Sequence, residues 1–223
     1  MCGIAGFINL TNKNNDSTNL SLLNKFCDLL SHRGPDSNGL WYDLEEKIFL
    51  AHTRLSINDL TKTGSQPMIN KNNGQTVIFN GEIYNHKEIR LNNLKDYNIK
   101  WTGNSDTETL LKTIEFFGIE KSLDLFEGMF AFCLYDKKNK KLYLVRDKFG
   151  EKPLYYGTIN NNFVFGSELK IFSFFPNFNN KISKVGLDSF LKYSYIPEPY
   201  SIYENIFKLS AGEYLVLNLN NIN

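Results

Sequence analysis

Short apolar segments separated by turn residues dominate the chain, and their composition predicts β-strands. Ile, Val, Phe and Tyr are enriched in these segments, while Gly, Asn, Asp and Lys stand between them. The predicted strands are residues 3–9, 47–51, 75–80, 128–136, 141–146, 154–158, 163–166 and 213–217. Polar turns at 136–140 and 160–162 join neighbouring strands, so these pairs are predicted to form hairpins.

Three further segments have the apolar spacing or the capping signal of helices. Residues 20–31 repeat apolar side chains at i, i+3 and i+4, which makes Cys27 a predicted core residue. The sequence from Ser105 to Glu108 has the form of a capping box and predicts a helix that ends near Gly118. A shorter amphipathic helix is predicted at 185–193. Hairpins with interspersed helices favour an α+β fold with antiparallel sheets over a regular βαβ alternation.

Composition narrows the classes of protein that this chain can be. Its 223 residues can bury a substantial core, and 25 basic against 24 acidic residues give a net charge of +1, which indicates neither nucleic acid nor a membrane surface as a partner. No apolar run approaches the roughly 20 residues that span a bilayer. Polar residues 11–16 also interrupt the apolar start, unlike a signal peptide.

The chain has three cysteines, at positions 2, 27 and 133. They are too few and too far apart for a disulfide framework or a zinc site, which favours a reducing, cytoplasmic location and no bound metal. Cys133 alternates with Phe132 and Leu134, so it is predicted to be a core residue.

Cys2 is the strongest candidate for chemistry. Removal of Met1 would leave this residue with a free α-amine beside its thiol, and unperturbed pKa values of about 7.7–8.0 and about 8.5 let the amine act as base for the sulfur. A nucleophile activated by an N-terminal amine is a known catalytic arrangement. The alternative is a small apolar residue that begins a buried strand.

Asn80-Gly81 also allows two interpretations. Asn-Gly between apolar residues is a strong signal for a hairpin turn. The functional interpretation is an oxyanion hole, in which the Asn80 amide and the Gly81 backbone N–H point at one developing charge. Glycine would suit such a site because a substrate oxygen must come close to the backbone.

Arg54 and Asp106 are weaker candidates when each is taken alone. Arg54 stands in an apolar run and could grip a carboxylate with two hydrogen bonds, although a lone Arg is usually a solvated rim residue. Asp106 lies at the first position of a predicted helix, where the helix dipole alone favours a carboxylate.

Taken together, these motifs resemble the glutaminase domain of class II glutamine amidotransferases, which are N-terminal-nucleophile hydrolases, and more narrowly the N-terminal half of glutamine-dependent asparagine synthetase. The resemblance covers nearly the whole chain and rests on an ordered series of motifs. These are Met1-Cys2-Gly3-Ile4, Ser31-His32-Arg33-Gly34-Pro35-Asp36, Arg54-Leu55-Ser56-Ile57, Phe79-Asn80-Gly81-Glu82-Ile83-Tyr84-Asn85, Thr102-Gly103-Asn104-Ser105-Asp106-Thr107-Glu108, Gly128-Met129-Phe130-Ala131-Phe132, Arg146-Asp147-Lys148-Phe149-Gly150, Pro153-Leu154-Tyr155-Tyr156 and Gly166-Ser167-Glu168.

The resemblance implies a role for each matching residue. Cys2 matches the nucleophile and its own amine the general base, while Asn80 and Gly81 match the oxyanion donors. Arg54 matches the residue that holds the glutamine α-carboxylate. The remaining matches are Asp106, with Glu82 nearby, for the α-ammonium, and the backbone of Leu55, Ser56, Ile57 and Asn58 for further glutamine contacts.

The resemblance also implies a fold, partners and cofactors. The expected fold is a four-layer αββα sandwich of two antiparallel sheets, with residues 1–180 as the glutaminase domain and 181–223 as a connector to a C-terminal synthetase domain. The Asn-rich end at 218–223 is typical of a domain excised from a longer protein. L-Glutamine and that synthetase domain are the expected partners, and a homodimer stays open. Glutamine hydrolysis would need no cofactor, whereas the synthetase domain would use ATP and Mg²⁺.

Several alternatives remain at this point. A papain-like Cys–His enzyme would need one of His32, His52 and His86, but a nucleophile at the extreme N-terminus argues against that class. A sugar-amidating amidotransferase could carry a nearly identical domain. The hexosamine- and purine-forming enzymes share the Cys-Gly-Ile opening but fit less well, because the motifs at 33–36 and 81–85 are of the asparagine synthetase type. A catalytically dead docking domain is a further alternative. The roles of Arg33, Asp36, Arg146 and Asp147 stay open between ordering loops near the site and facing another domain.

Overall fold

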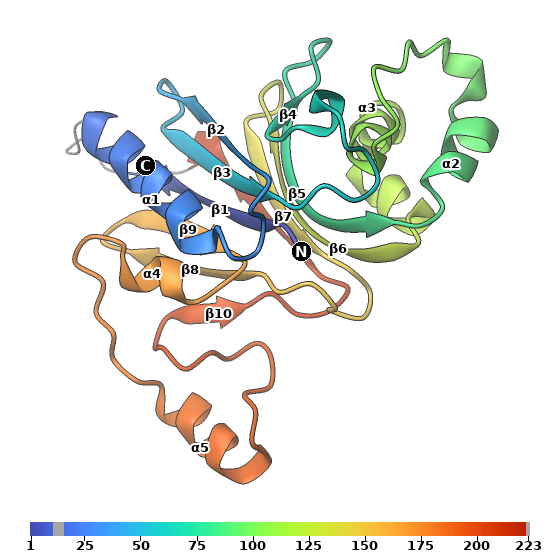
Figure 1. Ribbon diagram of the computed structural model, residues 1–223. Helices are drawn as coiled ribbons and strands as arrows, with labels where there is room; N and C mark the ends of the chain where they lie inside the picture. The colour runs from blue at the N-terminus through green and yellow to red at the C-terminus, as the bar shows by residue number, and fades with distance from the viewer. Residues whose placement is uncertain (11–15, 222–223) are drawn as a thin grey trace.

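Two antiparallel sheets form the centre of the protein (Figure 1), whose computed structural model describes residues 1–10 and 16–221. The first sheet has the order β10-β8-β9-β1-β3-β2 and the second the order β11-β7-β6-β5-β4. The strands of the first sheet are β1 (Gly3–Asn9), β2 (Ser37–Asp43), β3 (Ile48–Arg54), β8 (Tyr155–Ile159), β9 (Asn162–Gly166) and β10 (Ile206–Lys208). Those of the second are β4 (Met68–Ile69), β5 (Thr76–Ile83), β6 (Gly128–Asp136), β7 (Lys141–Arg146) and β11 (Tyr214–Asn218).

Helices cover the outer face of each sheet (Figure 1). The α-helices are α1 (Asp16–Leu30), α2 (His86–Glu88), α3 (Asp106–Leu125), α4 (Lys170–Ser173) and α5 (Lys184–Tyr193). The chain after α2 continues as a π-helical turn over Ile89–Asn93, and short 3₁₀ turns occupy Lys62–Gly64, Lys95–Tyr97 and Leu219–Asn221.

Three apolar clusters account for the layers. Alternate residues of a strand point to opposite faces, so β1 sends Ile4 and Ile8 into the layer between the sheets, and Ala5 and Phe7 toward α1. On the second sheet, Ile78 of β5 faces the space between the sheets, while its neighbours pack against α3. The predicted four-layer αββα sandwich is confirmed.

The rows of residues between the sheets change from apolar to polar at one end. On β3 the row of Ile48 and Leu50 continues as His52 and Arg54, and on β5 the row of Ile78 continues as Asn80 and then Glu82. The same two-residue period carries the row of β1 back from Ile4 to Cys2. Apolar side chains therefore fill most of the space between the two sheets. Polar side chains take their place at the end where these strand ends meet.

Some elements differ from the sequence-based prediction. β2, β4, β10, α2 and α4 were not predicted, since each is short or carries mostly exposed residues. The prediction of a helix end near Gly118 agrees with the backbone, although α3 as a whole runs on to Leu125. Gly118 has non-helical angles, φ +77° and ψ 171°, which glycine tolerates, so the first helical segment stops there and a second segment follows to Leu125. The second part continues because Ile119, Leu123 and Leu125 pack on the second sheet.

The segment expected to be a connector, residues 181–223, contributes to both sheets. β10 pairs with β8 at one edge of the first sheet, and β11 pairs with β7 at one edge of the second. Only α5 extends away from the sandwich (Figure 1). The boundary at residue 180 stays a prediction, and the last two residues of the Asn-rich end lie outside the described residues. Over residues 1–10 and 16–221, the structure has no helix with the length and apolar character needed to cross a bilayer.

Candidate active site

One cavity collects the predicted site residues at the polar end of the sandwich. Every predicted residue except Ser56 lines it, although they come from four separate parts of the chain. These are Cys2, Arg54, Leu55, Ile57, Asn58, Asn80, Gly81, Glu82 and Asp106. The lining residues that the sequence did not indicate are Met1, Asp59, Gly64, Gln66, Phe79, Ser105, Thr107, Met129 and Lys152.

Cys2 is held by main-chain contacts on both sides. The Leu55 N–H lies 3.4 Å from Cys2 Sγ, which in turn lies 3.6 Å from the Leu55 carbonyl. Arg33 Nε donates to the Cys2 carbonyl at 2.9 Å, and Arg33 Nη1 pairs with Glu168 at 3.0 Å. The Arg33 side chain therefore fixes the position of the nucleophile candidate from behind.

The pKa of the Cys2 thiol reflects opposing influences. Burial raises this pKa most strongly, while the Leu55 N–H, the N-terminal ammonium and Arg54 lower it. The net effect is a pKa above the usual range, so the sulfur needs a base to give up its proton near neutral pH.

Asn80 lies inside a strand, which excludes the hairpin interpretation. It sits within β5 and is opposite Ala131 of β6, with 1 % of its surface exposed. Neither its amide nitrogen nor its amide oxygen has a hydrogen-bond partner. Buried polar groups are almost always paired, whereas both polar atoms of this amide are free to bond to a group inside the cavity.

Gly81 has a structural reason to be glycine beyond access for a substrate. A Cβ at this position would stand 2.2 Å from the Met129 carbonyl oxygen and 2.6 Å from Phe130 Cα. The close approach of β6 therefore requires glycine here, and Gly81 itself lines the cavity beside Asn80.

Arg54 is buried and partly committed to its own loop. Its Nη1 donates to the Thr61 carbonyl at 2.8 Å, and its Nη2 donates to the Asp59 carbonyl. Burial alone would raise the pKa of Asp59, but hydrogen bonds from the Thr61 and Thr63 hydroxyls and from backbone amides lower it to about 2. The result is an ordered loop that holds the guanidinium at the cavity wall.

Asp106 lies at the start of α3 with 5 % of its surface exposed. One carboxylate oxygen accepts a hydrogen bond from the Ile83 N–H at 3.0 Å, and the other from the Thr107 N–H at 3.0 Å. Burial raises the pKa of this carboxyl, partly offset by these donors. The first contact ties the start of α3 to the end of β5, next to Glu82.

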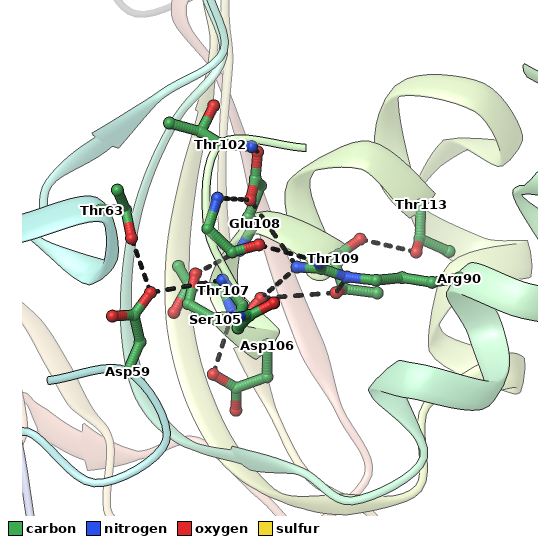
Figure 2. Close-up of polar contacts among 12 residues, drawn as sticks. Asp59, Thr63, Arg90, Thr102, Ser105, Asp106, Thr107, Glu108, Thr109 and Thr113 are labelled. Carbon is green, nitrogen blue, oxygen red and sulfur yellow. Dashed lines mark hydrogen bonds and ion pairs between the residues drawn. The ribbon is translucent and has the colours of Figure 1, made fainter. Parts of the chain in front are cut away.

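The capping box forms only by half, as Figure 2 shows. Ser105 Oγ accepts from the Glu108 N–H at 3.2 Å as expected. The Glu108 carboxylate instead accepts from the Thr102 N–H at 2.8 Å and the Gly103 N–H at 3.0 Å. It therefore shapes the loop before α3 rather than closing the box.

Arg90, which the sequence did not indicate, clamps the same loop (Figure 2). Its guanidinium donates to the Gly103 carbonyl at 2.9 Å, the Ser105 carbonyl at 2.7 Å and the Thr109 hydroxyl at 2.7 Å. It also stacks 3.8 Å from the centre of the Trp101 ring. This clamp holds the N-terminus of α3 and with it Asp106.

The sequence left the roles of Asp36, Arg146 and Asp147 undecided. In the structure, these side chains hold loops near the cavity in place. Asp36 accepts a hydrogen bond from the Ser56 N–H at 2.7 Å. Ser56 therefore takes part in the structure of the loop and does not line the cavity. Asp147 accepts hydrogen bonds from four backbone amides, those of Phe130, Phe149, Glu151 and Lys152. Arg146 donates to the carbonyls of Gly150, Lys152 and Leu209 and to Glu198.

The three histidines take no place in the cavity wall. Buried His52 contacts the Phe79 carbonyl through Nε2 at 3.2 Å, and burial lowers its pKa to about 4. Exposed His32 pairs with Glu168. In the part of the chain that the structure describes, no group of three or more His, Cys, Asp or Glu side chains could hold a metal ion.

Comparison with known proteins now assigns the chain to a family. The model of the glutamine amidotransferase domain matches residues 1–223. The chain belongs to the glutamine amidotransferase domain family. A putative glutamine-hydrolysing asparagine synthetase 2 of Methanocaldococcus jannaschii is 35% identical over 98% of this chain and 44% of its own length. Asparagine synthetase 2 of Bacillus subtilis, also described as glutamine-hydrolysing, is 36% identical over 98% of this chain and 29% of its own length.

Among solved structures, the fold is shared with an allosteric regulatory enzyme of purine biosynthesis. The TM-score is 0.68 at 19% sequence identity, over 97% of this chain and 47% of the other. This amidotransferase domain thus spans less than half the length of these relatives.

Proposed function

We propose that this domain hydrolyses L-glutamine to glutamate and ammonia with Cys2 as the nucleophile. The observation that carries the proposal is the unpartnered, buried Asn80 amide in the wall of the cavity that Cys2 also lines. Relatives described as glutamine-hydrolysing support the choice of substrate.

The proposed reaction starts after Met1 is removed. The α-amine of Cys2 takes the thiol proton, and the sulfur attacks the side-chain amide carbon of glutamine. The Asn80 amide and the Gly81 backbone N–H stabilise the oxyanion that develops. The protonated amine then gives its proton to the departing nitrogen, ammonia leaves, and water cleaves the γ-glutamyl thioester. These steps use no metal or cofactor.

Recognition of glutamine is assigned to the opposite charges of the cavity. Arg54 would hold the α-carboxylate, and Asp106, with Glu82 beside it, would accept the α-ammonium. Leu55, Ile57 and Asn58 border the same space, while Ser56 acts through the loop that Asp36 holds.

In a longer protein, the ammonia would pass to an ATP-dependent synthetase domain. The relatives named as asparagine synthetases favour aspartate as the acid to be adenylated, with ATP and Mg²⁺ used by that domain. A free catalytic thiol suits the reducing cytoplasm, and all three cysteines are free. The alternatives are an acceptor other than aspartate, such as a sugar, and a docking domain without catalysis.

The proposal predicts the products of residues 1–223 alone. Incubation with glutamine should release glutamate and ammonia in equal amounts, and ATP, Mg²⁺ or aspartate should leave the rate unchanged, because the chain carries no Gly-rich phosphate loop. Coupled assays for both products would measure this. Absence of turnover by a sample free of Met1 would contradict the proposed hydrolysis. ATP-dependent asparagine formation by residues 1–223 would contradict the assignment of that step to a separate synthetase domain.

A second prediction concerns binding. Asp106→Asn keeps an oxygen for the Ile83 N–H but removes the charge that would pair with the α-ammonium. We expect KM for glutamine to rise by about tenfold or more, with kcat changed little, because a charge-assisted contact present in both ground and transition states acts on binding. Asp96→Asn, at an exposed site, is the matched control. A fall in kcat at constant KM would refute a purely binding role.

A further inference from the structure

Lys152 is a buried cation that the proposed reaction does not use. Its side chain lines the cavity with only 6 % of the residue exposed. Over the described part of the chain, no carboxylate lies within ion-pair distance of its Nζ, whose one polar contact is Met1 Sδ at 3.5 Å. A thioether is a weak acceptor, so Lys152 lacks the charged partner that a buried Lys usually has.

The loop that carries Lys152 is fixed on both sides of this residue. Its N–H donates to Asp147 Oδ2 at 3.1 Å, and its carbonyl accepts from Arg146 Nε at 2.8 Å. Asp147 and Arg146 are themselves buried and bonded to several further backbone groups. These contacts fix the loop, which therefore holds the Lys152 ammonium at the cavity wall.

Other charges face the same space from neighbouring elements. Arg54 is positive, and Asp59, Glu82 and Asp106 are negative. The Asp59 carboxylate is occupied by Thr61 and Thr63, and the Asp106 carboxylate by the Ile83 and Thr107 amides. Behind the cavity, Arg33 contacts the Cys2 carbonyl and pairs with Glu168. None of these carboxylates neutralises Lys152 directly.

Removal of Met1 changes the surroundings of Lys152. The thioether leaves, and the new α-amine of Cys2 begins where Met1 was attached. Lys152 and Cys2 line the same cavity, and a positive charge near the new amine disfavours protonation of that amine and favours the thiolate over the thiol. Both the amine and the thiol would therefore bind a proton less tightly.

We propose that Lys152 lowers the proton affinity of the amine–thiol pair of processed Cys2, so that the amine is available as a base near neutral pH. This inference rests on the proposed function. Lys152 acts through the amine and needs no contact with glutamine.

The test compares pH profiles of processed protein. Loss of the positive charge should raise the pKa of the amine, so the acidic limb of kcat/KM, where activity falls as the amine gains a proton, should move to higher pH. For Lys152→Met we expect a shift of about one pH unit, which is a loss of about tenfold on the acidic limb and little change above pH 9. Lys152→Arg should keep the wild-type profile. Lys148→Met, at an exposed position of the same loop, is the control.

A second measurement is independent of turnover. The pH dependence of iodoacetamide alkylation at Cys2, followed by peptide mass spectrometry, should move in the same direction in Lys152→Met. If wild-type protein shows no glutaminase activity, the proposed function fails, and alkylation still decides on Lys152. A Lys152→Met profile that keeps its acidic limb would overturn the inference, whether or not the maximal rate falls, and melting temperatures would identify a folding defect.

Discussion

Cys2→Ala is expected to reduce glutamine hydrolysis by on the order of 10⁴-fold or more, because no other group lining the cavity can form the thioester. The fold should persist, since Cys2 precedes β1 and packs in none of the apolar clusters. Ammonia release and thermal unfolding would be measured on the same samples.

The matched control is Cys27→Ala, which removes a thiol from the buried face of α1. This variant should keep its activity and lose some stability. Intact mass must show that Met1 is absent, because an acylated amine cannot serve as the base. Turnover by Cys2→Ala would eliminate Cys2 as the nucleophile.

Asn80→Ala is expected to lower kcat by roughly 10²–10³, with a smaller effect on KM. The amide has no partner within the protein, so its loss breaks no internal hydrogen bond, and its contribution would arise only when charge develops on the substrate. Steady-state kinetics with glutamine would separate the two parameters. Asn92→Ala, at an exposed site, should behave as wild type.

If Asn80→Ala changed KM alone, the amide would bind the ground state and the oxyanion role would be wrong. An unchanged kcat and KM would leave the buried amide without a function in this reaction.

Much of the fold followed from local patterns. Strands such as 128–136 and 141–146 combine β-branched or aromatic residues with a polar turn, and the structure has β6 and β7 with the same bounds. β2 was missed because Ser37–Asp43 is an exposed edge strand whose pairing with β3, rather than its own composition, makes it a strand.

The site residues also fall into those that local sequence motifs revealed and those that only the tertiary contacts revealed. Cys2 and Asn80 could be singled out from sequence because their neighbours form motifs. Arg90 and Lys152 could not, since their importance comes from contacts made across long sequence separations. The capping box shows the reverse error, because the local motif was present but Glu108 found better-placed amides in the preceding loop.

The proposed nucleophile and the proposed oxyanion donor belong to different sheets. Their separation therefore depends on how the core packs between the sheets. Cys2 precedes β1 of the first sheet, and Asn80 lies on β5 of the second. Next to the cavity that both residues line, the sheets are held apart by the apolar layer that includes Ile4, Ile78 and Ala131. The width of that layer acts as a spacer that sets the reach from sulfur to amide. Side-chain volume deep in this sandwich therefore affects the alignment of the reacting groups as well as stability, and a core substitution that costs little folding energy can still slow the chemistry.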